Sequence, residues 1–211
     1  MKLVFIGYLD GFYYRPRVDI DLLKEHNEGI ICLSGCLKGE VTEKMLKDDW
    51  ESAKEAALRF AEIFENRFYL EVQNHGIPDE AQNIQNMKKL AGELNLPLVC
   101  TNDAHYAKHE HWEAHDVHIC LGTGKDRDDP NRLRYATPEF YFKTQDQMYE
   151  MFKDVPNAIE NTRKIADNID IELPMGDYHL PNFPIPEDAS DKDPDTYLQK
   201  LCETGVQNQY G

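Results

Sequence analysis

The chain has 211 residues, a hydrophobic fraction of 41% and a formal net charge of −16, so it can fill the core of a domain of ordinary size. No run of 18 apolar residues is present and no cleavage site follows the N-terminal apolar run, which argues against a membrane span and a signal peptide. The negative charge disfavours direct contact with nucleic acid unless a metal or a basic neighbour reverses the local sign, and it would suit a basic protein partner.

The first half of the chain alternates predicted strands with predicted helices. Short apolar segments predict strands at residues 28–34, 67–73 and 96–101. Apolar residues at helical spacing predict helices at residues 41–66, 79–95 and 108–121. We expect Asp79 to be the N-cap of the second helix, after Pro78. This alternation is typical of an α/β fold with a parallel sheet or barrel.

The second half of the chain has a different character. The GTGK segment at residues 122–125 lacks the frame of a phosphate-binding loop, so we interpret Gly122 as a helix C-cap. Two short helices are expected at residues 146–152 and 157–168. The segment 172–195 is rich in proline and predicts an extended linker, because proline is poorly tolerated inside helices and inner strands. A final helix is expected at residues 195–211.

The five cysteines are odd in number, widely spaced and without a CxxC pair. This pattern favours free thiols in a reducing compartment over a disulfide framework. We therefore expect a cytoplasmic location.

Chemically active side chains follow the predicted strands. In parallel α/β folds, functional residues collect at the carboxyl ends of strands. Cys36 follows the first strand, Glu71 and His75 lie at the end of the second, and Asp103 and His105 follow the third. Thiolate, carboxylate and imidazole together suit zinc, manganese or iron. The alternatives are that Cys36 is a small buried hydrophobe and that His75 is a loop residue.

The predicted helix at 108–121 is rich in histidine. His111, His115 and His118 fall within about 60° of one another on a helical wheel, which is compatible with a metal site or with a face turned to solvent or a partner. The HEHWEAH segment is not an HExxH zinc motif, so we favour the solvent or partner interpretation. A separate apolar stripe comprises Ala114, Val117, Cys120 and Leu121.

Ordered sequence blocks resemble a known family. The blocks are GFYYRPRVDIDLL, GIICLSGCLKGEV, FYLEVQNHG, PLVCTNDAHY, HDVHICLGTGK and TPEFYFKT. Together they resemble the C-terminal part of the PHP (polymerase and histidinol phosphatase) domain in the alpha subunits of bacterial replicative DNA polymerase III. Later blocks, AIENTRKIADNIDIELP and YHLPNFPIP, are similar to the stretch that leads toward the polymerase core.

The resemblance implies a fold and a metal site. The expected fold is α/β: a partial, distorted, TIM-like β/α barrel of the PHP type with a helical, proline-rich C-terminal extension. Residues 1–145 would be the C-terminal part of the PHP domain, and residues 146–211 would lead toward the polymerase core. Cys36, Asp103 and His105 match metal ligands of the family, for zinc or manganese, and Glu71 and His75 would help to shape the pocket. No catalytic residue can be assigned.

The resemblance also implies what the chain lacks. The family's early H-x-H and D-H-G ligand blocks are absent, and so are the paired aspartates of a polymerase palm, which binds magnesium. We therefore expect an internal fragment of a polymerase subunit that is inactive in isolation. Expected partners are the remainder of the alpha subunit, the proofreading exonuclease subunit and DNA. DNA would be reached through the complete polymerase subunit, which we call the parent. The alternatives are a non-catalytic interaction module and a free-standing PHP phosphoesterase.

Overall fold

The computed structural model describes residues 1–173, 175–178 and 180–211. Across these ranges, no helix combines the length and the apolar character needed to cross a lipid bilayer. Contacts divide the chain into two units, Met1–Ile169 and Asp170–Gly211. The sequence-based domain boundary after residue 145 stays a prediction, because it concerns the limits of the PHP domain.

A small parallel sheet lies at the centre of the first unit. Its strands are β1 (Cys32–Leu33), β2 (Phe68–Val72) and β3 (Leu98–Cys100), in the order β1-β2-β3. Cys32 pairs with Phe68, and Val72 pairs with Cys100, in parallel register. The expected mixture of helices and parallel strands is confirmed. The described residues form an open three-stranded sheet and not a closed barrel.

Strand β1 is much shorter than the predicted segment 28–34. Gly29 and Gly35 flank it with φ angles of +69° and +82°, a region that glycine enters without steric cost. These left-handed residues turn the chain away from the sheet on both sides of β1. The apolar run therefore predicted the position of the strand correctly but overestimated its length.

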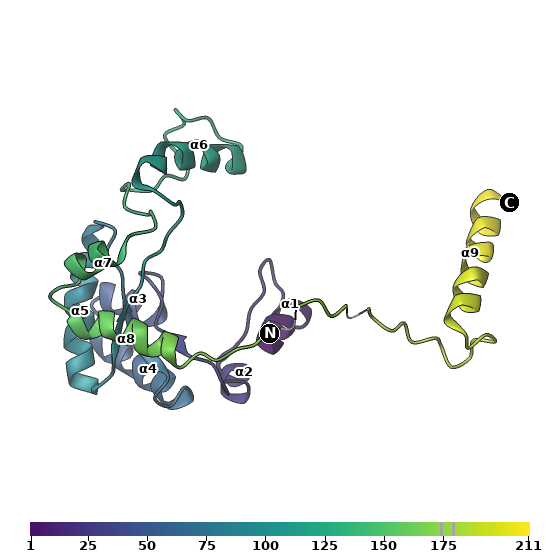
Figure 1. Cartoon of the computed structure of the whole chain (residues 1–211), viewed down its shortest axis with the longest axis horizontal. Helices are drawn as coiled ribbons and strands as arrows, with labels where there is room; N and C mark the ends of the chain where they lie inside the picture. The colour runs from purple at the N-terminus through teal and green to yellow at the C-terminus, as the bar shows by residue number, and fades with distance from the viewer. Residues whose placement is uncertain (174, 179) are drawn as a thin grey trace. The chain divides into compact units, whose positions relative to one another are not determined.

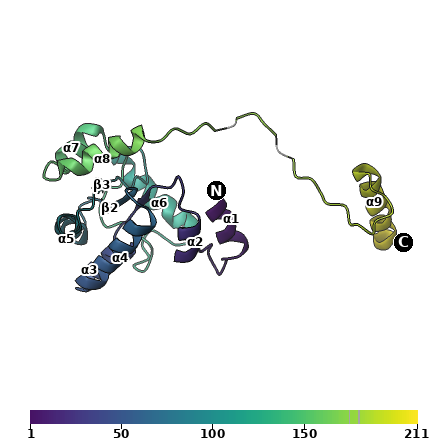
Figure 2. The ribbon, with the colours of Figure 1, turned by 90° about the horizontal axis from the view of Figure 1, so that it is seen from below.

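The predicted helix at 41–66 is two helices, α3 (Glu40–Leu46) and α4 (Trp50–Ile63). Asp48 adopts a left-handed φ of 59°, which ends the helical path. Asp49 then caps α4 by accepting a hydrogen bond from Ser52 N at 3.2 Å. Figure 2 shows α3 and α4 next to each other, and the two helices are in contact.

Two predicted helix caps are wrong. Helix α5 (Pro78–Leu94) has Ile77 as its N-cap, and Asp79 lies inside its first turn, because Pro78 suits the first helical position. The histidine-rich segment forms a short 3-10 helix, η1 (His109–His111), followed by α6 (Trp112–Thr123). The C-cap of α6 is Gly124, whose φ is 63°, and Gly122 lies inside the helix.

Five further helices complete the described structure. They are α1 (Lys2–Leu9), α2 (Ile20–Glu25), α7 (Gln145–Met151), α8 (Pro156–Asp167) and α9 (Pro194–Tyr210). Helix α8 packs on β3, and Asn161 Nδ2 donates to the Leu98 carbonyl at 2.7 Å. Helices α3, α4, α5, α7 and α8 gather around the sheet, whereas α6 is set apart from them (Figure 1).

The core of the first unit is built around β2. Phe68, Leu70 and Val72 are buried, as the alternating pattern predicts. They pack with buried residues of α3, α4 and α5, namely Val41, Met45, Ala53, Ala56, Ala57, Met87 and Leu90. This packing fixes the sheet and therefore the loops that leave its carboxyl edge.

Candidate functional site

The chain leaves β2 and β3 at the same edge of the sheet. Residues 73–75 follow β2, and residues 101–103 follow the neighbouring strand β3. Because the two strands are parallel and adjacent, these loops meet: His75 Nε2 lies 3.3 Å from the backbone nitrogen of Asp103. The structure thus brings together two residues that the sequence separates by 28 positions.

Asp103 and His105 are brought close enough to bind one ion. Asp103 Oδ2 lies 3.2 Å from His105 Nε2, and both side chains are partly exposed. Two ligand atoms on a tetrahedral zinc ion, each about 2.0–2.1 Å from the metal, are about 3.3 Å apart. The observed separation therefore matches neighbouring ligand positions on a single ion. A carboxylate and an imidazole are also the donors that zinc and manganese accept.

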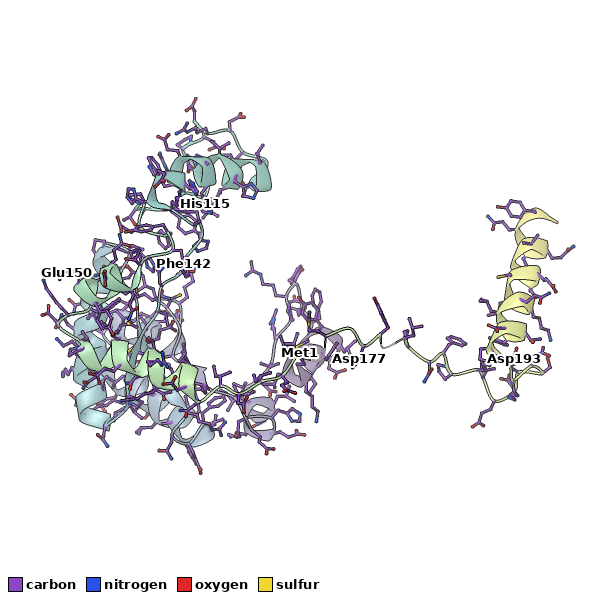
Figure 3. The ribbon with its side chains drawn as sticks, viewed as in Figure 1. Met1, His115, Phe142, Glu150, Asp177 and Asp193 are labelled. Carbon is purple, nitrogen blue, oxygen red and sulfur yellow. The ribbon has the colours of Figure 1, made fainter. Side chains whose placement is uncertain are left out.

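The His105 imidazole is surrounded by aromatic rings. Tyr135 Oη lies 3.1 Å from His105 Nε2, and the rings of His115 and Phe140 are each centred 5.7 Å from the His105 ring. Figure 3 labels His115 on α6. Burial, followed by the neighbouring His105 and His118, lowers the pKa of His115, so its neutral form is favoured.

This position of His115 corrects part of the sequence interpretation. His111 and His118 are exposed, as a face turned to solvent requires, but His115 is half-buried against the aromatic cluster. Its helical spacing gave no sign of this difference, because the contacts come from Tyr106 and Tyr135 outside the helix. In the apolar stripe of α6, Cys120 is buried, whereas Ala114, Val117 and Leu121 are exposed.

Glu71 is buried near the carboxyl end of the central strand β2. It accepts a hydrogen bond from the Thr101 hydroxyl, and its backbone nitrogen donates to Ser34 Oγ at 2.8 Å. Burial and then the Glu71 charge raise the pKa of Cys32 to about 11, which keeps that thiol protonated at neutral pH. These bonds connect the neighbouring strands, so Glu71 is placed to hold the sheet edge together.

Cys36 lies on an exposed loop after β1. The loop is tight, because a side chain at Gly39 would meet the Ser34 carbonyl oxygen at 2.2 Å. Among the residues that the structure describes, no three His, Cys, Asp or Glu side chains are near enough to hold one metal ion. The structure therefore pairs Asp103 with His105 and does not add Cys36 to them. These two donors fit a metal only as part of a larger ligand set.

Further charged residues lie near this region, and no sequence pattern predicted a role for them. Glu80, on α5, is buried against His75 with a distance of 2.7 Å between Oε1 and Nδ1. Arg132 makes two hydrogen bonds of 2.7 Å to the carboxylate of Asp116 on α6. A hollow of about 450 Å³ beside this pair is lined by Tyr106, Trp112, His115, Arg134 and Tyr135, among others. Only the folded chain brings these residues together.

Comparison with known proteins finds one family model and a set of similar proteins. The family model described as "PHP domain" matches residues 1–75, which include Cys36, Glu71 and His75. The DNA polymerase III subunit alpha of Borreliella burgdorferi is 41% identical over all of this chain, and that of Thermus aquaticus is 37% identical over all of it. The subunit of Treponema pallidum is 39% identical over 97% of the chain. Along its whole length, the chain is therefore similar to one segment of DNA polymerase III alpha subunits.

The chain spans less than a fifth of these alpha subunits: 18% of the Borreliella burgdorferi and Thermus aquaticus proteins and 17% of the Treponema pallidum protein. Asp103 and His105 lie after the residues matched by the PHP model but inside the region aligned with the alpha subunits. The chain therefore includes residues that match the PHP model and residues that are aligned with the alpha subunits beyond that match.

Proposed function

We propose that this chain works as part of the alpha subunit of a replicative DNA polymerase III, whose reaction is DNA-directed DNA synthesis from deoxynucleoside triphosphates. The supporting observation is the similarity to alpha subunits along the whole chain, at 41% identity to the Borreliella burgdorferi protein. The parent polymerase would use magnesium in its palm, outside this segment. A cytoplasmic location follows from this role.

Within the parent, we propose that the sheet of this segment is one part of a distorted PHP-type barrel. Asp103 and His105 would contribute two ligands for zinc or manganese, and Cys36 a third. The remaining ligands would come from the early blocks that the resemblance places outside these residues. A bound metal would supply Lewis-acid activation for 3′–5′ exonuclease or related phosphoesterase chemistry.

The chain's own contribution to that chemistry is to provide metal ligands in a fixed arrangement. The 3.2 Å separation of Asp103 Oδ2 and His105 Nε2 suits a shared ion. Tyr135, 3.1 Å from His105 Nε2, restricts the rotation of the imidazole. No residue of the chain is assigned as general acid or base. If the metal site is not completed, the same segment acts as structural support within the subunit.

A chimaeric polymerase tests the proposal. The 211 residues replace the matching segment of the Borreliella burgdorferi alpha subunit, and primer extension is measured with magnesium. We expect extension close to that of the unchanged subunit, because the segment keeps its place in the fold. A folded chimaera that does not extend a primer would contradict the proposed membership of a working polymerase.

The same chimaera tests the metal role. Degradation of single-stranded DNA from its 3′ end is measured with zinc or manganese for His105→Gln and Asp103→Asn. We expect each to lower this activity at least about 10-fold while primer extension is retained. His118→Gln is the matched control, because His118 is exposed on α6 and outside the aromatic cluster. Equal nuclease activity in all three variants would exclude Asp103 and His105 as ligands.

The main alternative is a non-catalytic interaction module. It is favoured by the lack of a three-donor group among the described residues and by the net charge of −16. Its proposed partners are the remainder of the alpha subunit and the proofreading exonuclease subunit, with DNA reached through the parent. Elemental analysis of the purified chimaera distinguishes the two. Bound zinc or manganese that decreases in Cys36→Ser supports the metal site, whereas an absence of both metals with and without this substitution supports the interaction module.

A further inference from the structure

A histidine and a glutamate are buried together directly behind the Asp103–His105 turn. The side chains of His75 and Glu80 are 1% and 5% exposed. Glu80 Oε1 lies 2.7 Å from His75 Nδ1, and Glu80 Oε2 accepts a hydrogen bond from His75 N at 2.5 Å. Burial would raise the pKa of Glu80, but the contacts with His75 and a backbone hydrogen bond from Ile77 together outweigh burial and lower it. Glu80 is therefore a carboxylate at neutral pH.

The hydrogen-bond partners determine which nitrogen of His75 carries the proton. A carboxylate can only accept, so Nδ1 must donate to Glu80. Nε2 faces the backbone N–H of Asp103 at 3.3 Å and must accept from it. The two contacts are satisfied together only when Nδ1 carries a proton and Nε2 carries none. The orientation of Asp103 is thus connected, through His75, to the charge of Glu80 on α5.

His105, at the other end of the turn, is bonded to Phe140, which stacks on His75. The Phe140 ring stacks on the His75 ring, with centroids 4.4 Å apart and an interplanar angle of 2°. The Phe140 carbonyl accepts a hydrogen bond from His105 N at 2.7 Å. Thr137 adds a hydrogen bond of 2.5 Å from its hydroxyl to the His75 carbonyl. The backbone of Asp103 and that of His105 are therefore both bonded to the stacked pair of His75 and Phe140.

We propose that Glu80 and His75 are positioning residues that set the geometry of the Asp103–His105 turn for metal binding. This inference rests on the proposed metal role of Asp103 and His105. Both ring nitrogens of His75 and both carboxylate oxygens of Glu80 already make hydrogen bonds inside the fold, so these two side chains are not assigned as ligands. Glu80 fixes the tautomer of His75, and His75 fixes the backbone of Asp103, in the way that groups behind metal ligands commonly set ligand direction.

Glu80→Gln tests the proposal at constant size. A glutamine places an NH₂ group opposite one of the two N–H groups of His75. The backbone N–H of His75 cannot lose its proton, whereas the imidazole can transfer its ring proton from Nδ1 to Nε2. The glutamine NH₂ group therefore donates to Nδ1, and Nε2 carries the ring proton. Nε2–H then opposes the N–H of Asp103, and the turn loses its bond. Glu93→Gln is the matched control, since Glu93 lies on the same helix and pairs with Lys54 at 3.0 Å.

The readouts are measured on the whole chain. Nitrogen NMR reports the His75 tautomer, and amide exchange reports the protection of the Asp103 N–H. Paramagnetic broadening during a Mn²⁺ titration reports binding at the turn. We expect the Nδ1–H tautomer in the unchanged chain and in Glu93→Gln. In Glu80→Gln we expect the Nε2–H tautomer, faster exchange at Asp103, and about 10-fold more Mn²⁺ for half-broadening of the turn's signals.

The outcomes separate this inference from the function on which it rests. An absence of Mn²⁺ broadening at the turn of the unchanged chain overturns the metal role of Asp103 and His105 itself. Normal broadening with the same Mn²⁺ dependence in Glu80→Gln overturns the positioning role alone. Should Glu80→Gln fail to fold by circular dichroism, the unchanged chain decides: an Nε2–H tautomer of His75 refutes the arrangement and an Nδ1–H tautomer supports it.

Discussion

At the scale of single residues, Asp116 is an enclosed carboxylate whose charge is balanced from several sides. Its side chain is 7% exposed, and the Arg132 side chain that bonds to it is 3% exposed. The hydrogen bonds from Arg132 lower the pKa of Asp116, and the charges of Arg132, Arg134 and Arg127 act in the same direction. This pair joins α6 to the segment that follows it, and so supports the aromatic cluster around His105.

We expect this pair to make the chain sensitive to acid. Because the folded-state pKa of Asp116 lies below its unfolded value of about 3.9, the pair stabilises the fold above that pH. The contribution is lost as the pH falls through the folded pKa. Asp116→Asn should therefore lower the melting temperature at neutral pH and flatten its decline between about pH 5 and pH 2.5. Thermal unfolding monitored by circular dichroism measures both effects.

The control for this prediction is Asp167→Asn, which removes an exposed ion pair with Arg163 on α8. Exposed pairs contribute little to stability, so its melting curve should follow that of the unchanged chain. If Asp116→Asn retained the full acid sensitivity of the unchanged chain, the stabilising role of the Arg132 contact would be refuted.

At the scale of elements, short polar signals decide where helices begin. Asp48 and Asp49 divide a continuous helical pattern into α3 and α4, and Thr144 starts α7 with a capping box. In that box, Gln147 N donates to Thr144 Oγ1 at 3.3 Å, and Thr144 N donates to Gln147 Oε1 at 2.9 Å. Local bonds of this kind satisfy backbone groups that the first turn of a helix leaves without partners.

Thr144→Ala should destabilise the chain by about 1 kcal/mol, because it removes the acceptor for the Gln147 backbone N–H. Thr144→Ser keeps the hydroxyl and should leave stability nearly unchanged. Urea unfolding monitored by circular dichroism gives the two free energies of unfolding. Equal losses in both variants would mean that the threonine methyl group, and not the cap, stabilises α7.

At the scale of the whole molecule, the two units differ in how much they bury. The buried apolar residues of the described chain lie in Met1–Ile169, whereas α9 in Asp170–Gly211 buries none of its residues. The first unit also presents apolar side chains on α1, including Phe5 and Tyr8, each 59% exposed. Exposed apolar surface of this kind is typical of sites that contact another protein surface.

Removal of residues 170–211 should leave the unfolding of the first unit nearly unchanged, because the core of the described chain lies within residues 1–169. The melting temperatures of the two forms, measured by differential scanning calorimetry, should agree within about 2 °C. A decrease of several degrees in the shorter form would show that the second unit stabilises the first.

Removal of residues 146–169, which include α8 on β3, should instead prevent cooperative folding.

The sequence by itself determined the alternation of helices and strands, the parallel sheet and the resemblance to DNA polymerase III alpha subunits. It also indicated Asp103 and His105, because residues two apart after a strand point the same way. Only the tertiary structure decided where β1 ends, where α3 and α4 divide, and that His115 lies beside His105. It alone connected Glu80 to Asp103 through His75. Periodicity reports which face of an element is apolar, whereas contacts between distant segments depend on how the elements pack.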